Sequence, residues 1–298
     1  MRYLAFFSII LFLAACSNNN TAEEQATEPG IQILVDESFA PIIDDQYQVF
    51  KSSYPNLKVE LFYKSENAVI HSLQEGDVGI AILSRKLLPQ EIKLFEKREI
   101  SVRANKVATD AVAFITHKSS TDSSITVDEV TGIMRGAASA KNLIFDNANS
   151  SNVRYLKDLA EIKDLPKKGV YALQSNDDVI KYVHNNPGTI GVIGINWMKQ
   201  PTKELEPIVK QLKVLSVKNS KGLPGSDKFY KPSQNNLALG LYPLSRDIFF
   251  IDCQGGRAGS SFEAFVAGER GQRIILKSGL MPNKIPSREI LIRETRKP

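Results

Sequence analysis

Short apolar runs alternate with amphipathic stretches along the chain from Ile31 onward. The first run, residues 31–35, predicts a strand. Apolar positions recur every three or four residues behind Pro41, which predicts a helix with proline in its first turn. Strands that alternate with helices in this way are typical of an α/β fold whose sheets are covered by helices.

The remaining pattern predicts further strands and helices in the same alternation. The predicted strands are residues 59–63, 78–83, 107–116, 143–145, 190–195, 211–217 and 246–252. One predicted helix ends at Gly76, and another extends through Leu159. A third begins at the capping box of Thr126 and Glu129, and a fourth begins at a cap formed by Ser175 and Asp178. A fifth begins at a cap formed by Ser260 and Glu263 and ends near Gly279. Residues 107–116 are long enough to leave one lobe and enter another, and residues 237–241 would bring the chain back.

The length of 298 residues exceeds what one compact core usually holds, so we expect two lobes with a cleft between them. A content of 42% hydrophobic and 24% charged residues argues against disorder and against a protein with many membrane spans. The net charge is +5, but Lys and Arg are scattered among acidic residues. This pattern favours a solvated surface over a nucleic-acid interface.

The first residues have the features of a targeting segment. Arg2 is followed by an apolar run, residues 4–13, that is too short to span a membrane as a mature helix. The sequence Leu-Ala-Ala-Cys then ends at Cys16 and resembles the lipobox of bacterial lipoproteins, which implies a signal peptide over residues 1–16 and lipid on Cys16. Residues 17–30 are polar and predict a flexible tether. Cys253 would then be the one remaining thiol, so no intramolecular disulfide is expected.

Polar side chains follow several predicted strands. Residues 36–39, Ser84-Arg85 and residues 146–152 each stand where a strand ends. Because ligands of open α/β sheets gather at the carboxyl ends of the strands, these loops are candidates for a binding site.

Six segments together resemble the phosphate-binding protein family of phosphate ABC transporters, a branch of the periplasmic solute-binding proteins. They are GDVGIAILSR (76–85), ATDAVA (108–113), GTIGV (188–192), YPLSR (242–246), GQ (271–272) and GLMP (279–282). The resemblance implies a two-lobe, type II binding-protein fold with two crossings. Lobe 1 would hold residues 31–109 and 237–298, lobe 2 would hold residues 110–236, and hinges would lie near Thr109-Asp110 and Asn236-Leu237.

The resemblance also implies where an oxyanion binds. Ser38-Phe39 matches the first anion-binding turn of the family, a hydroxyl residue and an aromatic residue before a helix. Hydroxyls and helix N-termini supply the donors that a dehydrated phosphate needs. A serine at this place could instead only cap the helix.

A second part of the site aligns with the Ser-Gly-Thr loop of the family. Here the loop reads Ser150, Ser151, Asn152, so that serine replaces glycine and asparagine replaces threonine. The alternative is a plain Asx or Ser turn that caps the next helix. Some relatives have an arginine where this chain has Phe145-Asp146, a departure that Arg154 could compensate.

Three further positions complete the candidate set. Ser84 and Arg85 offer a hydroxyl and a guanidinium suited to forked contact with an oxyanion, although Arg85 could equally hold loops together in an ion pair. Some relatives carry an aspartate around this position. Asp110 could accept a proton from the oxyanion, or fix the hinge through hydrogen bonds to backbone N–H groups.

We therefore expect a lipid-anchored, monomeric protein of a bacterial cell envelope that faces the periplasm. It would close around phosphate or a similar oxyanion and pass it to an ABC permease in the inner membrane. The alternative is an envelope signalling or interaction protein with the same fold and a degenerate site, as Glu37, Asp146 and the missing glycine suggest. The three histidines lack metal-ligand spacing, and no nucleophile-elbow or P-loop pattern occurs, so no enzyme, metal or cofactor is expected.

Overall fold

We describe the protein from a computed structural model, in which residues 30–254 and 256–286 are described. The predicted signal peptide, Cys16 and nearly all of the tether lie outside these residues. None of the helices in the described ranges is both long and apolar enough to cross a membrane.

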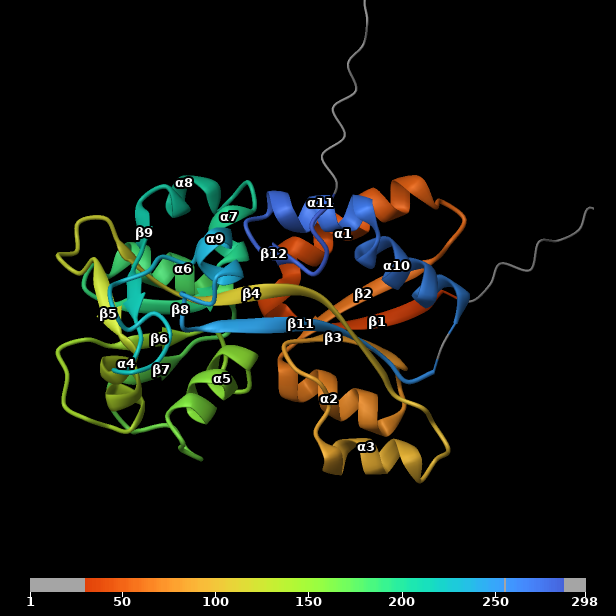
Figure 1. The fold of residues 1–298 in the computed structure, drawn as a ribbon, viewed down its shortest axis with the longest axis horizontal. Helices are drawn as coiled ribbons and strands as arrows, with labels where there is room; N and C mark the ends of the chain where they lie inside the picture. The colour runs from red at the N-terminus through yellow and green to blue at the C-terminus, as the bar shows by residue number, and fades with distance from the viewer. Residues whose placement is uncertain (1–29, 255, 287–298) are drawn as a thin grey trace, which may run out of the picture.

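Two sheets share one long strand, β4 (Arg103–His117), which runs through the middle of the molecule beside β11 (Figure 1). Sheet A contains the first part of β4, and sheet B contains the second part. We call sheet A with its helices lobe 1, and sheet B with its helices lobe 2. In sheet A the order is β2 (Val59–Lys64), β1 (Ile31–Asp36), β3 (Ile80–Leu83), β11 (Ser245–Asp252) and the first part of β4, with β12 (Met281–Pro282) also on β4. In sheet B the second part of β4 is followed by β8 (Ile190–Gly194), β6 (Leu143–Phe145) and β7 (Val170–Ala172), with β9 (Leu212–Val214) also on β4.

The directions of the strands determine which strand ends lie at the same edge of a sheet. β1 is parallel to β2 and β3, and β6 is parallel to β7 and β8, so the carboxyl ends of these strands meet at one edge of each sheet. β11 runs antiparallel to both β3 and β4 and, like β4, reaches from one lobe to the other (Figure 1).

Helices cover both faces of each sheet. Those of lobe 1 are η1 (Glu37–Phe39), α1 (Ala40–Ser53), α2 (Glu66–Glu75), α3 (Pro89–Glu96), α10 (Arg257–Ala267) and α11 (Glu269–Lys277). Those of lobe 2 are α4 (Val127–Met134), α5 (Ser151–Leu159), α6 (Asn176–Asn185), α7 (Asn196–Lys199) and α8 (Glu206–Val209). The short helix α9 (Gln234–Ala238) contacts β12 of sheet A.

Alternation along β1 explains the layers of lobe 1. Ile33 and Val35 belong to the same apolar cluster as Phe50 of α1 and Phe262 of α10, whereas Leu34 belongs to the cluster on the side of α2 and α3. Successive residues of a strand point to opposite faces, so an apolar run is buried on both sides. The predicted fold class, an α/β protein with two lobes, is confirmed.

Several local predictions are confirmed by their hydrogen bonds. Thr126 and Glu129 form the capping box of α4: the Glu129 amide donates to Thr126 Oγ1 at 3.0 Å, and the Thr126 amide donates to Glu129 Oε2 at 2.8 Å. Ser175 caps α6 through the Asp178 amide at 3.2 Å, and Gly76 ends α2 in a left-handed conformation.

Two local predictions are wrong. Residues 211–217 form two strands, because the chain leaves β4 after Val214 and pairs as β10 (Ser216–Lys218) with β5 (Ser124–Thr126). Most of the segment 237–241, expected to bring the chain back, lies in or just after α9, and the next strand of sheet A is β11.

The second error concerns the helix expected from Ser260. It begins earlier, as α10, because the Ser260 amide donates to the Gly256 carbonyl at 2.9 Å inside the helix. Gly268 then separates α10 from α11. The boundaries at residues 109–110 and 236–237 stay a prediction.

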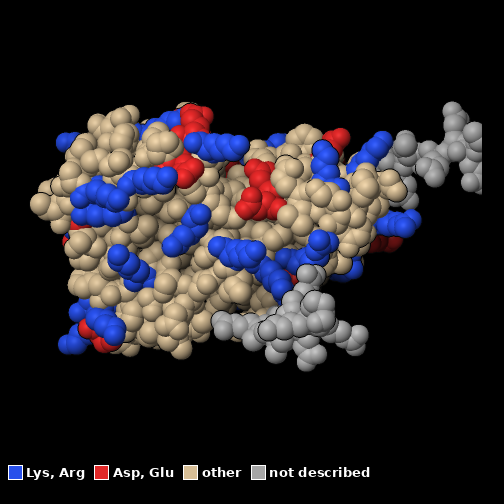
Figure 2. Space-filling view, turned by 90° about the horizontal axis from the view of Figure 1, so that it is seen from above, with Lys and Arg blue, Asp and Glu red and all other residues tan. Residues whose placement is uncertain are grey.

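Charged side chains are spread over the outside of both lobes. Figure 2 shows Lys and Arg along the whole length of one face, with Asp and Glu among them.

Candidate functional site

Two helices, one from each lobe, begin at the same buried place. In lobe 1 the chain turns from β1 through η1 into α1, and Asp36 Oδ1 accepts a hydrogen bond from the Ser38 amide at 3.1 Å. In lobe 2, Ser150 caps α5 by accepting from the Val153 amide at 3.3 Å. The first amides of a helix have no partner within it and carry a partial positive charge, so such a meeting point suits an anion.

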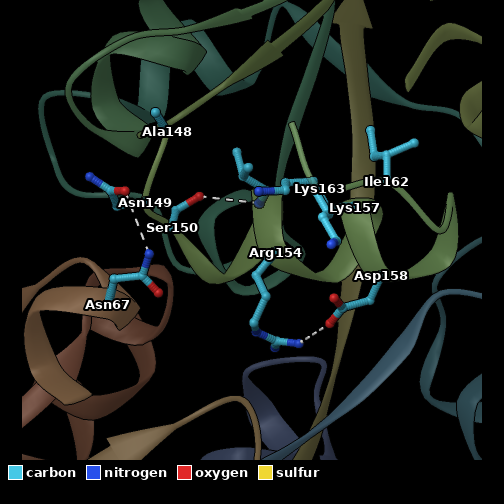
Figure 3. Close-up of a pocket in the computed structure, with 10 residues that line it drawn as sticks. Asn67, Ala148, Asn149, Ser150, Arg154, Lys157, Asp158, Ile162 and Lys163 are labelled. Atoms are coloured by element: carbon cyan, nitrogen blue, oxygen red, sulfur yellow. Dashed lines mark hydrogen bonds and ion pairs between the residues drawn. The ribbon is translucent and has the colours of Figure 1, made fainter. Parts of the chain in front are cut away.

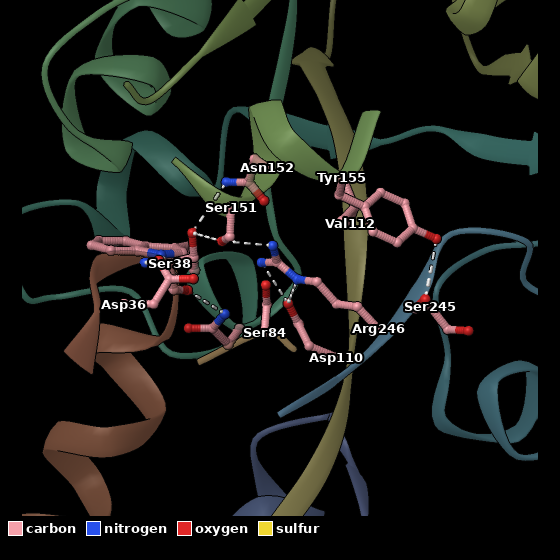
Figure 4. A network of polar contacts seen from close by, with 12 residues as sticks. Asp36, Ser38, Ser84, Asp110, Val112, Ser151, Asn152, Tyr155, Ser245 and Arg246 are labelled. Carbon is pink, nitrogen blue, oxygen red and sulfur yellow. Dashed lines mark hydrogen bonds and ion pairs between the residues drawn. The ribbon is translucent and has the colours of Figure 1, made fainter. Parts of the chain in front are cut away.

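Side chains from these two helix starts touch across the lobes (Figure 4). The hydroxyls of Ser38 and Ser151 lie 3.1 Å apart, and Asn152 Nδ2 donates to Ser38 Oγ at 3.4 Å. All three residues are fully buried. We call this place the crevice.

Arg246 of β11 supplies the positive charge of the crevice. Its Nη1 donates to Ser151 Oγ at 2.9 Å, and its Nε and Nη2 donate to Asp110 Oδ2 at 3.1 and 3.0 Å. The guanidinium also lies over the Phe39 ring, 4.9 Å from its centroid. Arg246 thus links the strand that crosses between the lobes to both helix starts.

The Ser38 carbonyl is held from lobe 2. Asn196 Nδ2 and Trp197 Nε1 each donate to it at 3.0 Å. This contact requires glycine at position 194, because a Cβ there would lie 2.6 Å from Asn196 Nδ2 and 3.0 Å from Asp110 Oδ2.

Three buried aspartates surround the crevice. Burial raises the pKa of Asp110 and of Asp146, and burial together with the charge of Glu66 raises the pKa of Asp36 to about 7. Asp146 accepts hydrogen bonds from Ser150 Oγ at 2.6 Å and from the amide groups of Asn152 and Asn176 at 3.2 and 3.1 Å. Some of the donors near the crevice are therefore already occupied by carboxylates of the chain itself.

A second buried cluster ties the lobes together beside the crevice. Glu66 of α2 is fully buried, accepts from Ser84 Oγ at 2.5 Å and forms an ion pair with Arg154 of α5. Arg154 Nη2 also donates to Ser84 Oγ at 2.8 Å. We call these three residues the interlobe latch.

An open pocket of about 370 Å³ adjoins the latch at the junction of the lobes (Figure 3). Asn67 comes from lobe 1, and its amide hydrogen bonds with the Asn149 carbonyl at 3.4 Å. Ser150, Arg154 and Lys157 line the pocket from lobe 2. The pocket thus leads from the surface toward the loop that starts α5.

Five of the residues predicted for the site meet in the crevice: Ser38, Phe39, Asp110, Ser151 and Asn152. Asp110 lies against Arg246 and its Oδ1 accepts no hydrogen bond from the described residues, so the hinge-fixing hydrogen bond to backbone N–H groups stays a prediction. Whether any of these residues binds the solute stays a prediction.

The other three predicted residues have different partners. Ser150 caps α5 and donates to Asp146, and Ser84 belongs to the interlobe latch. Arg85 is held by Glu91 through two contacts of 2.7 and 2.8 Å, which agrees with the ion-pair alternative. Arg154 bonds to Glu66 and Ser84 of the other lobe, and whether it compensates for the missing arginine stays a prediction.

Sequence reasoning missed four residues of these clusters: Glu66, Asn196, Trp197 and, as a side chain of the crevice, Arg246. Asn196 and Trp197 directly follow β8, so the rule about the carboxyl ends of strands could have found them. Nothing local distinguishes Glu66, whose partner lies 88 residues away. Arg246 ends the YPLSR segment, but that segment does not reveal its partner Asp110, which lies 136 residues away. Within the described ranges, no three His, Cys, Asp or Glu side chains are grouped so that they could hold a metal ion.

Comparison with known proteins adds the following. Residues 20–270 match the PBP superfamily domain. The chain is 23% identical to the phosphate-binding protein PstS of Borreliella burgdorferi over 293 residues, which covers 92% of this chain and 97% of the relative.

Solved structures have a similar fold. A substrate-binding protein of Clostridium perfringens, assigned to phosphate ABC transport and solved with bound phosphate, superposes with a TM-score of 0.68 at 19% identity, over 86% of this chain and all of that one. An ABC-type phosphate transport receptor from Vibrio cholerae superposes with a TM-score of 0.63 at 19% identity, over 85% of this chain and all of that one.

Proposed function

The chain belongs to the PBP superfamily, and we propose that it is the solute-binding protein of an ABC transporter, with phosphate or a similar oxyanion as its solute. The resemblance to phosphate-binding proteins that the sequence motifs indicated is confirmed. Those relatives are named for binding, and we propose a binding role and not a catalytic one.

One observation carries the proposal: donors from both lobes converge on one buried point. The hydroxyl of Ser38 comes from lobe 1, and the hydroxyl of Ser151 and the start of α5 come from lobe 2. Arg246 Nη1 points to the same place. A small anion at this point would touch both lobes at once, so it would stabilise the closed form over the open one.

Arg246 supplies a positive charge that this chain lacks at position 146. In this chain the acid Asp146 stands where some relatives have an arginine, and its hydrogen bonds go to Ser150, Asn152 and Asn176. The positive charge instead comes from β11. Because Arg246 is buried against Asp110 and the Phe39 ring, its guanidinium is held in place before the solute arrives.

The test is calorimetric titration of the full chain, purified in detergent, with phosphate. We expect saturable binding that Ser38→Ala and Ser151→Ala each weaken about tenfold or more, because each removes a donor to a buried anion. If millimolar phosphate, sulfate and related oxyanions neither bind nor raise the melting temperature, the proposal is wrong and the signalling alternative gains support.

We also propose that lipid on Cys16 anchors the protein in the bacterial envelope, facing the periplasm, where it works as a monomer with an ABC permease. The Leu-Ala-Ala-Cys sequence behind a short apolar run supports the anchor. Metabolic labelling with a radioactive fatty acid should mark the wild-type chain and not Cys16→Ser. Equal labelling of both chains would contradict the anchor.

A further inference from the structure

Asp36 has an unusual position at the end of β1. Its side chain is fully buried, and its Oδ1 accepts from the Ser38 amide, the start of the helix that faces the crevice. Its other oxygen, Oδ2, is buried and accepts no hydrogen bond of good geometry from the described residues, although the nearby Ser151 hydroxyl lowers the pKa of the carboxyl group slightly. An unpaired buried carboxylate oxygen is costly, so this atom needs either a proton or a partner that is not part of the chain.

The charged groups around Asp36 do not offset the cost of burying its unpaired oxygen. Glu66 of α2 acts against its ionisation, and Arg246 of β11 favours it. Arg246, however, already has two hydrogen bonds to Asp110 of β4. Lys64 of β2 is paired in register with Asp36, but its amine bonds to Ser72 Oγ at 3.2 Å.

The remaining charged groups nearby are engaged elsewhere. They are Arg85 after β3 with Glu91, Arg154 of α5 with Glu66 and Asp158, and Asp146 before α5 with three donors. An anion that enters beside Ser38 and Ser151 therefore brings negative charge to a carboxyl group that lacks a free cation.

We propose that Asp36 is a specificity-determining residue of the anion site, whose carboxyl group must carry a proton when the solute is bound, so that capture of the anion takes up one proton from solution. This inference rests on the proposed function. In the protonated state Oδ2–H becomes a donor, which gives the unpartnered atom a bond to the anion and removes the repulsion between two negative groups.

The ligand-free protein is suited to such a linkage. Burial and the neighbouring Glu66 raise the pKa of Asp36 to about 7, so the proton is gained or lost close to neutral pH. If only the protonated form binds, the apparent dissociation constant increases by a factor of 1 + 10^(pH − pKa). This factor is about 1.1 at pH 6 and about 11 at pH 8, so affinity should fall about tenfold over that range through Asp36 alone.

The experiment is calorimetric titration of the full chain with inorganic phosphate at pH 6, 7 and 8, in buffers of different ionisation enthalpy. Phosphate itself titrates in this range, so the readout is the difference between the wild-type chain and Asp36→Asn. Asparagine can still accept from the Ser38 amide and donates permanently, as the protonated acid would. We expect equal affinities at pH 6, about tenfold tighter binding by Asp36→Asn at pH 8, and an uptake of nearly one proton more by the wild-type chain at pH 8.

Glu60→Gln is the matched control, because it changes an exposed acid of the neighbouring strand β2 to its amide and should leave the pH profile unchanged. Asp36→Ser provides a second variant if the asparagine chain does not fold. Parallel pH profiles and equal proton uptake in the wild-type and Asp36 variants would overturn the inference and leave the proposed function standing. No binding of phosphate by any chain at pH 6 would overturn the proposed function, and the inference with it.

Discussion

The interlobe latch leads to a specific prediction about the closure of the two lobes. Glu66 is fully buried and its ion-pair partner Arg154 comes from the other lobe, so the pair exists only when the lobes are closed. Changing Arg154 to Met keeps the length of the side chain and leaves Glu66 buried without its partner. The cost should therefore fall on closure and on binding, and not on the folding of either lobe.

The size of the effect follows from the burial of the pair. Removing one partner of a buried ion pair costs about 3–5 kcal/mol. Here the Arg154 side chain is 24% exposed, and Arg85 Nε stays 3.6 Å from Glu66, so we reduce the cost to about 2 kcal/mol. At about 1.4 kcal/mol per factor of ten, phosphate should bind roughly 30-fold more weakly to Arg154→Met.

The assay is calorimetric titration with phosphate, together with small-angle scattering to follow closure. Lys157→Met is the matched control: it lies on the same helix three positions on, removes the same charge, and should change affinity less than threefold. The double variant Glu66→Gln with Arg154→Met should recover much of the loss, since no unpaired charge stays buried. Unchanged affinity in Arg154→Met, or an equal loss in Lys157→Met, would refute the reasoning.

Four further substitutions test neighbouring contacts. Ser150→Ala should lower the free energy of unfolding by about 1–2 kcal/mol, because it removes the cap of α5 and a donor to a buried acid. Ser151→Ala removes the buried acceptor of Arg246 Nη1 and should also lower stability, but it should weaken phosphate binding more than Ser150→Ala does; calorimetry and thermal unfolding measure the two effects, and a larger loss of affinity in Ser150→Ala would contradict the site. Trp197→Phe removes one of two donors to the Ser38 carbonyl and should weaken binding by about 1 kcal/mol, or roughly fivefold, with no change expected if the lobes do not close on the solute. The raised pKa of Asp36 means that its contribution to stability is present at pH 4 and is lost as the pH rises through about 7. Asp36→Asn should therefore raise the melting temperature of the ligand-free chain by several degrees at pH 8 and not at pH 4. An equal shift at both pH values would contradict this assignment.

Much of the fold could be predicted from the sequence, because buried residues recur with a short, regular spacing along each strand or helix. The apolar run of β1, the capping box of Thr126 and the stop at Gly76 each depend on residues within a few positions of one another. The family motifs indicated two lobes for a similar reason, since they recur as short segments in a fixed order. Where a local signal was ambiguous, as at Ser260, the prediction failed: a serine followed by a glutamate three positions later also fits the interior of a helix.

The sequence alone also identified most residues that meet in the crevice: Ser38, Phe39, Ser151 and Asn152 stand at or just before the start of a helix, and Asp110 stands inside the long strand that crosses between the lobes. It did not determine which side chain bonds to which. Ser38 touches Ser151, Arg246 reaches Asp110 and Arg154 reaches Glu66 across 113, 136 and 88 residues, and no periodic pattern extends over such distances. Only the packing of one lobe against the other decides that the positive charge of the site comes from Arg246, and that Arg85 and Ser150 bond elsewhere.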